Sequence, residues 1–167
     1  MVLFGVGQGR AYSLLGNLAR CPIGLGSLTA PSSESLYQAS RFPHDRVLQR
    51  EIASLDGHAA KRAARSQAKH TAQDWVARRR VAMFAALNLK LPTPTVSDCL
   101  LRTGSAPIIE VSPHDLFWGA TNAGDCLLGA NLLGRMWMVL RSLREEQRAT
   151  TYRWATQRCV ALWPHLN

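Results

Sequence analysis

The sequence has few of the features that identify membrane or secreted proteins. No apolar run approaches the roughly 18 residues that a membrane-spanning helix needs. The first ten residues have neither the basic start nor the long apolar core of a secretory signal. Acidic residues are also scarce, 11 against 20 Lys and Arg, which gives a net charge of +9. We therefore expect a cytoplasmic protein without a membrane partner, whose basic surface is either simply solvated or binds a polyanion.

Familiar metal and cofactor motifs are missing as well. The glycines of Gly5-x-Gly7-x-Gly9 lack the strand–helix context of a phosphate-binding loop, and no G-x-S-x-G elbow occurs. The four cysteines are widely spaced, with no C-x-x-C pair, which predicts neither a zinc site nor a disulfide framework. They are Cys21, Cys99, Cys126 and Cys159. We expect no metal and no cofactor.

The length and composition predict a globular chain. With 167 residues, 47% of them hydrophobic and 19% charged, the sequence suits one domain over residues 1–167. Helical patterns dominate, and strand patterns are few and short. The fold class that follows is α+β, a predominantly helical single domain with a few short strands. Charge is uneven: residues 41–80 carry ten Lys/Arg against four Asp/Glu, and residues 81–134 reverse this balance.

Capping signals and apolar spacing place the helices and strands. Thr71 with Asp74 three positions later resembles a capping box that opens a long helix, although aspartate replaces the usual glutamate. Residues 22–29 and 107–111 are predicted strands. Other helices are predicted to begin at Ser32-Ser33-Glu34 and to cover residues 45–55, part of 58–70, 96–101, the stretch from 129, and 150–162.

A first group of candidate functional residues lies on the helix that begins near Ser33. Glu34, Gln38 and Arg41 follow the i, i+4, i+7 spacing, so they share one face, and Tyr37 lies close to it. A salt-bridging surface face is the ordinary alternative, but the apolar residues around these positions indicate a covered helix. Lys61 belongs to an alanine-rich basic helix that either faces phosphate or is merely solvated.

A second group lies in residues 110–134. It combines a carboxylate (Asp115), an aromatic plate (Trp118) and Gly119, and a polar Asn131 then opens an amphipathic helix. Glycine lets a backbone approach a ligand closely, tryptophan offers a flat face to a base or sugar, and a helix N-terminus favours phosphate. We interpret this stretch as part of a binding site.

The two acids, Glu34 and Asp115, suit cleavage of an N-glycosidic bond. Such a reaction develops positive charge on the sugar, which a carboxylate stabilises, and a second acid or base handles the water or the departing base. Trp75, at the first turn of its helix, and Trp118 can stack on the base. Arg41 adds a hydrogen-bond donor.

An ordered series of motifs over residues 12–147 resembles the NADAR (YbiA-like) family. The resemblance implies an α+β, mainly helical fold and N-glycosidase activity. It also implies two substrate classes, phosphoribosylamino-pyrimidine intermediates of riboflavin synthesis and ADP-ribose attached to guanine in nucleic acid, and a functional quartet of Glu34, Trp75, Asp115 and Trp118. The motifs are Glu34-x-x-Tyr-Gln-Ala-x-x-Phe42, Asp74-Trp75, Met83, Leu100-Leu-x-Thr-Gly104, Glu110-x-x-x-x-Asp-x-x-Trp-Gly119, Gly129-x-Asn-x-Leu-Gly134 and Met138-x-x-Arg141.

Two positions depart from the family pattern. Arg41 stands where the family usually has lysine. A lysine amine could form an imine with an opened ribose, and an arginine cannot; Lys61 is another available amine. Leu15-Gly-Asn-Leu18 replaces the family's Leu-Ser-Asn-Phe, and its Asn17 is read as a turn residue or a ligand contact.

Three functional hypotheses follow. The first is an N-glycosidase that removes ADP-ribose from guanine in nucleic acid, which the +9 charge favours because phosphate contacts need Lys and Arg. The second is an N-glycosidase of the riboflavin-pathway intermediates. The third is a non-catalytic module that binds ADP-ribose or nucleic acid. The candidate catalytic residues are Glu34, Asp115 and Arg41, and the candidate substrate-binding residues are Trp75, Trp118, Gly119, Asn131, Asn17, Tyr37 and Lys61.

Overall fold

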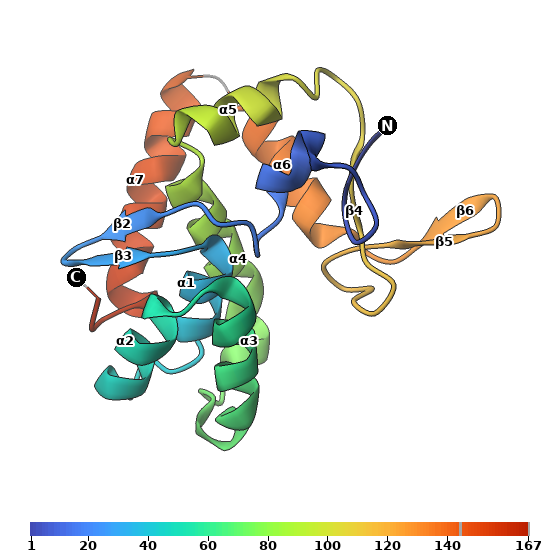
Figure 1. Ribbon diagram of the computed structural model, residues 1–167. Helices are drawn as coiled ribbons and strands as arrows, with labels where there is room; N and C mark the ends of the chain where they lie inside the picture. The colour runs from blue at the N-terminus through green and yellow to red at the C-terminus, as the bar shows by residue number, and fades with distance from the viewer. Residues whose placement is uncertain (144, 167) are drawn as a thin grey trace. The chain divides into compact units, whose positions relative to one another are not determined.

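The computed structural model describes residues 1–143 and 145–166, the side chains of residues 159 and 160 excepted. The side chain of Cys159 therefore lies outside the described residues. Helices predominate and the strands are short, which confirms the predicted α+β class (Figure 1). The chain divides into two compact units, Met1–Gly16 with Thr93–Arg148 and Asn17–Pro92 with Ala149–Asn167. Each unit is built around its own buried residues.

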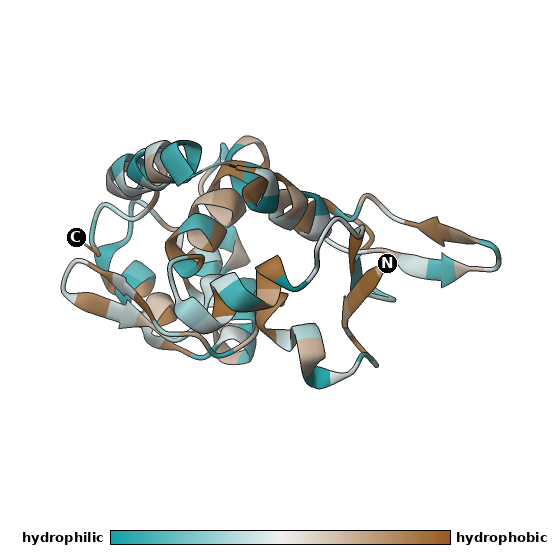
Figure 2. Ribbon diagram, turned by 90° about the horizontal axis from the view of Figure 1, so that it is seen from above, coloured by the Kyte–Doolittle hydropathy of each residue, from teal (hydrophilic) through white to brown (hydrophobic). Residues whose placement is uncertain are grey.

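The first unit is organised around a parallel strand pair. The two strands pair from Val2 opposite Ile108 to Gly5 opposite Val111, and the strand beside the N-terminus is strongly hydrophobic (Figure 2). The unit contains β1 (Val2–Gly5), η1 (Arg10–Leu15), α5 (Pro94–Leu101), β4 (Ile108–Val111), β5 (Thr121–Ala123), β6 (Cys126–Leu128) and α6 (Leu132–Ser142).

Buried side chains of α6 hold this unit together. Trp137 and Leu140 are fully buried, and the Trp137 indole Nε1–H donates to the Leu15 carbonyl oxygen at 2.7 Å. One turn later, Arg141 Nη1 donates to Thr103 Oγ1 at 2.7 Å and to the Ala106 oxygen at 2.8 Å. The amphipathic pattern from residue 129 onward thus marks a helix with one buried side, as predicted.

The second unit is mainly helical. An antiparallel hairpin, β2 (Ile23–Leu25) and β3 (Leu28–Ala30), precedes the helices. The others are α1 (Ser33–Ala39), α2 (Arg46–Ser54), α3 (Gly57–Ser66), η2 (Ala68–His70), α4 (Trp75–Lys90) and the part of α7 (Glu145–Leu162) from Ala149 onward.

Helix α1 is the centre of the second unit, since all seven of its residues are buried. Ser32 caps it, because the Ser32 hydroxyl accepts the Ser35 amide N–H at 3.1 Å. Helices α2, α3 and α4 all pack against it. A short helix gains little from its own hydrogen bonds, so this burial is what stabilises α1.

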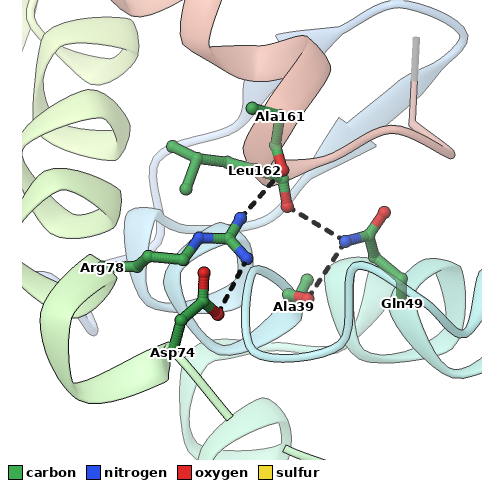
Figure 3. A network of polar contacts seen from close by, with 6 residues as sticks. All are labelled: Ala39, Gln49, Asp74, Arg78, Ala161 and Leu162. Atoms are coloured by element: carbon green, nitrogen blue, oxygen red, sulfur yellow. Dashed lines mark hydrogen bonds and ion pairs between the residues drawn. The ribbon is translucent and has the colours of Figure 1, made fainter. Parts of the chain in front are cut away.

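The C-terminal segment is attached to the backbone of α1 and to its surroundings. Trp163 Nε1–H donates to the Leu36 oxygen at 2.7 Å. Gln49 Nε2 donates to the Ala39 oxygen at 3.3 Å and to the Leu162 oxygen at 3.1 Å, so that one amide joins α1 to the end of α7 (Figure 3).

Arg78 of α4 makes a second connection to the C-terminal segment. Its guanidinium donates to the Ala161 oxygen at 2.8 Å and pairs with the Asp74 carboxylate at 3.4 Å (Figure 3). The start of α4 is therefore tied to the same segment that supports α1.

Several local predictions differ from the structure. The capping box at Thr71 is wrong: α4 begins at Trp75, after Asp74, whose side chain makes no capping hydrogen bond. Helix α5 begins at Pro94, because proline is well accommodated in a first helical turn. The stretch between Gly119 and Gly129, for which no strand was predicted, forms the β5–β6 hairpin, with one hydrophilic and one hydrophobic strand (Figure 2).

Candidate functional site

Glu34 is the centre of a buried polar arrangement in the second unit. It is only 2% exposed, and its carboxylate accepts hydrogen bonds from Asn17 Nδ2 and from Gln38 Nε2, the latter at 2.7 Å. The Asn17 carbonyl oxygen accepts the Glu34 amide at 2.9 Å and the Ser33 hydroxyl at 3.1 Å. A buried charge needs such partners, and together they fix where the carboxylate lies.

Arg41 extends this arrangement past the end of α1. Its Nη1 donates to Gln38 Oε1 at 3.2 Å, and its Nη2 donates to Thr71 Oγ1 at 3.1 Å. The predicted shared face of Glu34, Gln38 and Arg41 is confirmed, with Gln38 as the bridge. The Arg41 Nε is buried and has no hydrogen-bond partner among the residues that the structure describes.

Two aromatic rings lie beside these polar groups. The rings of Tyr37 and Trp75 are 5.1 Å apart between centroids, at an interplanar angle of 48°. The Arg41 guanidinium carbon lies 5.8 Å from the centroid of the Trp75 ring, within the range of a cation–π contact. Trp75 is partly exposed at the start of α4, whereas Tyr37 is buried. Trp75 therefore keeps some ring surface accessible next to a fixed cation.

The charge on Arg41 is balanced by its surroundings. Burial lowers the pKa of Arg41, Tyr37 and Glu34 act to raise it, and the nearby Arg65 lowers it. A guanidinium is far more basic than an ammonium and remains protonated in proteins. Arg41 thus provides a cation and hydrogen-bond donors in this arrangement, and no free amine.

Helix α3 packs against α1 through its first residue. A Cβ added to Gly57 would lie 3.0 Å from Ser32 Oγ and 3.2 Å from Glu34 Cβ, so the lack of a side chain allows the close approach. Lys61, on the same helix, is exposed. Its predicted contact with substrate remains a prediction.

Asp115 belongs to the first unit, where it shapes a tight turn. Its Oδ1 accepts the amide N–H groups of Phe117 at 3.2 Å and Trp118 at 3.0 Å. Its own amide donates to Ser112 Oγ at 3.1 Å. This is an Asx-type turn, in which one carboxylate oxygen replaces a backbone acceptor. No residue that the structure describes hydrogen-bonds the other oxygen, Oδ2.

Trp118 and Gly119 lie at the end of that turn. Trp118 is 8% exposed, and its ring meets the Phe117 ring edge-on at 4.9 Å and 83°. A Cβ on Gly119 would lie 2.7 Å from Ser112 Cβ and 2.8 Å from the Glu110 oxygen. The glycine is therefore required by close packing within the protein itself. Its predicted contact with substrate remains a prediction.

Asn131 hydrogen-bonds the backbone of β4. Its Oδ1 accepts the Glu110 amide and its Nδ2 donates to the Ile108 oxygen, both at 2.9 Å. The residue has φ of 48°, a left-handed conformation that asparagine tolerates well. Three residues later Gly134 is obligatory, because a Cβ there would overlap the Ile108 oxygen and the Asn131 amide. Both polar atoms of the Asn131 side chain thus hydrogen-bond the backbone of β4. The predicted contact of Asn131 with substrate remains a prediction.

The candidate residues form two groups, one in each unit. Sequence reasoning missed Thr71 and Ser33 as hydrogen-bond partners, because nothing in the local sequence signals contacts across 30 or 16 positions. Among the described residues, no group of His, Cys, Asp and Glu is arranged to hold a metal ion, and no helix is long and apolar enough to cross a membrane. The second unit contains Asn17, Glu34, Tyr37, Arg41, Lys61 and Trp75, and the first contains Asp115, Trp118, Gly119 and Asn131.

Comparisons with known proteins match this chain over most of its length. The NADAR domain model covers residues 8–145. The riboflavin biosynthesis protein PYRR of Zea mays is 35% identical over 68% of this chain and 20% of its own length. A riboflavin biosynthesis protein of Vibrio vulnificus is 31% identical over 81% of this chain and 36% of its own length. The chain thus spans only about a fifth to a third of these two relatives.

A bacterial relative is closer in size. N-glycosidase YbiA of Escherichia coli is 28% identical over 78% of this chain and 80% of its own length. The NMR structure of the E. coli protein YbiA superimposes with a TM-score of 0.72 at 28% identity, covering 89% of this chain and 86% of that one. Since the family model spans the segments that carry Glu34, Arg41, Trp75, Asp115 and Trp118, this chain belongs to the NADAR domain family.

Proposed function

We propose that this protein is an N-glycosidase that hydrolyses the bond between ADP-ribose and a guanine base in nucleic acid. The observation that carries the proposal is the buried Glu34 carboxylate, held by the amides of Asn17 and Gln38 beside a fixed cation and two aromatic rings. Family membership and a relative named as an N-glycosidase support the reaction type.

Hydrolysis of an N-glycosidic bond has three parts. The bond from the anomeric carbon to the base nitrogen breaks, water adds to that carbon, and the base nitrogen takes up a proton. Positive charge grows on the sugar in the transition state, and a carboxylate already oriented stabilises it without reorganising. In this proposal Glu34 supplies that charge, and Asp115, through Oδ2, handles the proton of the water or the base.

The remaining residues would bind the substrate. Trp75 and Trp118 offer ring faces to the base. Arg41 places its guanidinium against Trp75 and keeps one buried N–H unpartnered among the described residues, a donor that a phosphate oxygen of ADP-ribose would satisfy. Since arginine forms no imine, the proposed reaction is direct hydrolysis by water.

Glycosidase activity is tested by measuring release of ADP-ribose from an oligonucleotide that carries one ADP-ribosylated guanine. We expect Glu34→Gln to lower the rate by about 10²–10³-fold, the usual loss when one transition-state electrostatic contact is removed. The exposed Glu51→Gln on α2 removes the same charge elsewhere and should leave the rate unchanged. Wild-type turnover that Glu34→Gln retains would contradict the proposal.

Asp115 requires a separate pair of variants. We expect Asp115→Asn to lower the rate of ADP-ribose release, whereas Asp125→Asn, at an exposed position between β5 and β6, should not. Asparagine at position 115 keeps an oxygen for the Phe117 and Trp118 amides, so the turn should survive. A rate unchanged in Asp115→Asn would remove this residue from the mechanism.

A second candidate substrate is a phosphoribosylamino-pyrimidine. The two relatives named as riboflavin biosynthesis proteins favour it. Both substrates should be offered to the purified protein and ranked by kcat/KM. A preference for the small phosphorylated ribosyl-pyrimidine would replace the nucleic-acid substrate while leaving the reaction type intact.

The non-catalytic alternative rests on Arg41. If the reaction needs a lysine amine at this position, wild type should bind ADP-ribose without turnover, and Arg41→Lys should gain a large rate. If hydrolysis is direct, wild type should turn over and Arg41→Lys should weaken binding, because one ammonium cannot reproduce the hydrogen bonds to Gln38 and Thr71 together with the stacking on Trp75.

A further inference from the structure

Helix α3 has a buried face and an opposite basic face. The buried face is formed by Gly57, Ala60 and Ala64, and all three pack without polar atoms in their side chains. The residues at the i, i+3, i+4 and i+7 positions from His58 are all exposed, so they line one side of the helix. With Lys69 of η2, which is also exposed, they define the α3 stripe: His58, Lys61, Arg62, Arg65 and Lys69.

The stripe carries positive charge without matching acids. No Asp or Glu occurs between residues 57 and 73, and Lys61 and Arg65 are a like-charge pair at i, i+4, which destabilises a helix slightly. Among the described residues, none of the stripe's side chains makes an ion pair; the Asp56 carboxylate, which caps α3, lies near His58 and Arg62. Arg78 of α4, by contrast, pairs with the Asp74 carboxylate just before that helix.

The stripe also adjoins the candidate site within the same unit. At its start, Gly57 packs against Glu34. Beyond its end, Thr71 accepts a hydrogen bond from Arg41, and Arg65 is close enough to Arg41 to affect it electrostatically. The segment 57–71 therefore runs between the two ends of the Glu34–Gln38–Arg41 arrangement. If the candidate site holds one nucleotide of a strand, the neighbouring nucleotides would extend along α3.

We propose that the α3 stripe binds the phosphate backbone of the nucleic-acid strand whose modified base enters the candidate site. From His58 to Arg65 the helix rises about 10 Å, a length over which its cations can contact neighbouring phosphates of one strand. The inference rests on the proposed function, since it is the nucleic-acid substrate that supplies a strand. A free nucleotide would have nothing to place on the stripe.

The test measures binding of an unmodified single-stranded 12-mer DNA by fluorescence anisotropy at a series of NaCl concentrations. The double variant Lys61→Gln/Arg62→Gln should bind more weakly, and its plot of log Kd against log salt should be shallower by about 1.4, about 0.7 for each phosphate that is no longer neutralised. The matched control, Arg80→Gln/Arg153→Gln, removes two exposed cations from α4 and α7 and should retain the wild-type slope.

Three results would overturn the inference. Equal weakening of DNA binding in the stripe variant and in the control would show general charge attraction without a defined surface. A wild-type slope near zero would show that the protein makes no phosphate contacts. Competition by polyglutamate as effective as that by unlabelled DNA, charge for charge, would indicate an acidic protein partner instead.

Failure of this inference is distinguishable from failure of the proposed function. The 12-mer carries no ADP-ribose, so its binding does not depend on glycosidase activity. Release of ADP-ribose from a mononucleotide together with no salt-dependent DNA binding would overturn the role of the α3 stripe alone. DNA binding through the stripe without any release of ADP-ribose would overturn the glycosidase proposal alone.

Discussion

Replacing Asn131 by alanine should destabilise the protein strongly, because the side chain is a structural part of the β4 edge. The change leaves the Glu110 amide and the Ile108 carbonyl without their partners. Each unsatisfied buried backbone group costs about 1–3 kcal/mol. Alanine in the left-handed conformation at φ of 48° costs roughly another 1 kcal/mol. We therefore expect the free energy of unfolding to fall by about 3 kcal/mol or more.

Two further variants at this position separate the contributions. Asn131→Gly loses both hydrogen bonds but tolerates positive φ, so it should be about 1 kcal/mol more stable than Asn131→Ala. Asn131→Asp keeps an acceptor for the Glu110 amide but sets a carboxylate oxygen against the Ile108 oxygen, so it should be no more stable than Asn131→Ala near neutral pH. Urea unfolding followed by circular dichroism measures all three. A decrease below about 1 kcal/mol in Asn131→Ala would refute the structural role.

Other predictions concern packing, the C-terminal segment and pH. Gly134→Ala should lower the thermal midpoint, by overpacking worth about 1–3 kcal/mol, because the new Cβ overlaps the Ile108 oxygen. Trp163→Phe should cost about 1–3 kcal/mol in urea unfolding, because the Leu36 oxygen loses its buried donor; an unchanged midpoint would contradict that role. The pKa of Asp56 is lowered chiefly by the Ala59 amide, so its stabilisation is present above the unfolded pKa of about 3.9 and lost as pH falls through the folded value. An NMR titration of Asp56 should show the low pKa, and the stability difference between wild type and Asp56→Asn should shrink as the solution is acidified below about pH 4.

Short-range patterns in the sequence predicted the central helix of the second unit well. The serine cap and the i, i+4, i+7 spacing place Glu34, Gln38 and Arg41 on one face of α1 and just beyond it, and hydrogen bonds join all three. These signals depend on neighbours within two helical turns, which is the range over which sequence spacing determines contact.

Predictions that depend on distant contacts were less successful. Thr71 looks like a helix cap, but its hydroxyl accepts a hydrogen bond from Arg41, 30 positions earlier. The parallel pairing of β1 with β4 joins segments more than 100 residues apart, and no local pattern encodes such a partner. The role of Asn131 likewise depends on the edge of β4, so a residue that the sequence suggests as a ligand donor proves to be committed to the backbone.

The most direct test of the proposed glycosidase is the mass of an oligonucleotide carrying a single ADP-ribosylated guanine after incubation with wild type and Glu34→Gln, with Glu51→Gln as the matched control. We predict that wild type and the control restore the unmodified oligonucleotide with one free ADP-ribose per strand, and that Glu34→Gln leaves the modified strand intact at the same protein concentration. An unchanged modified strand with properly folded wild-type protein, or full restoration by Glu34→Gln, would contradict the proposal.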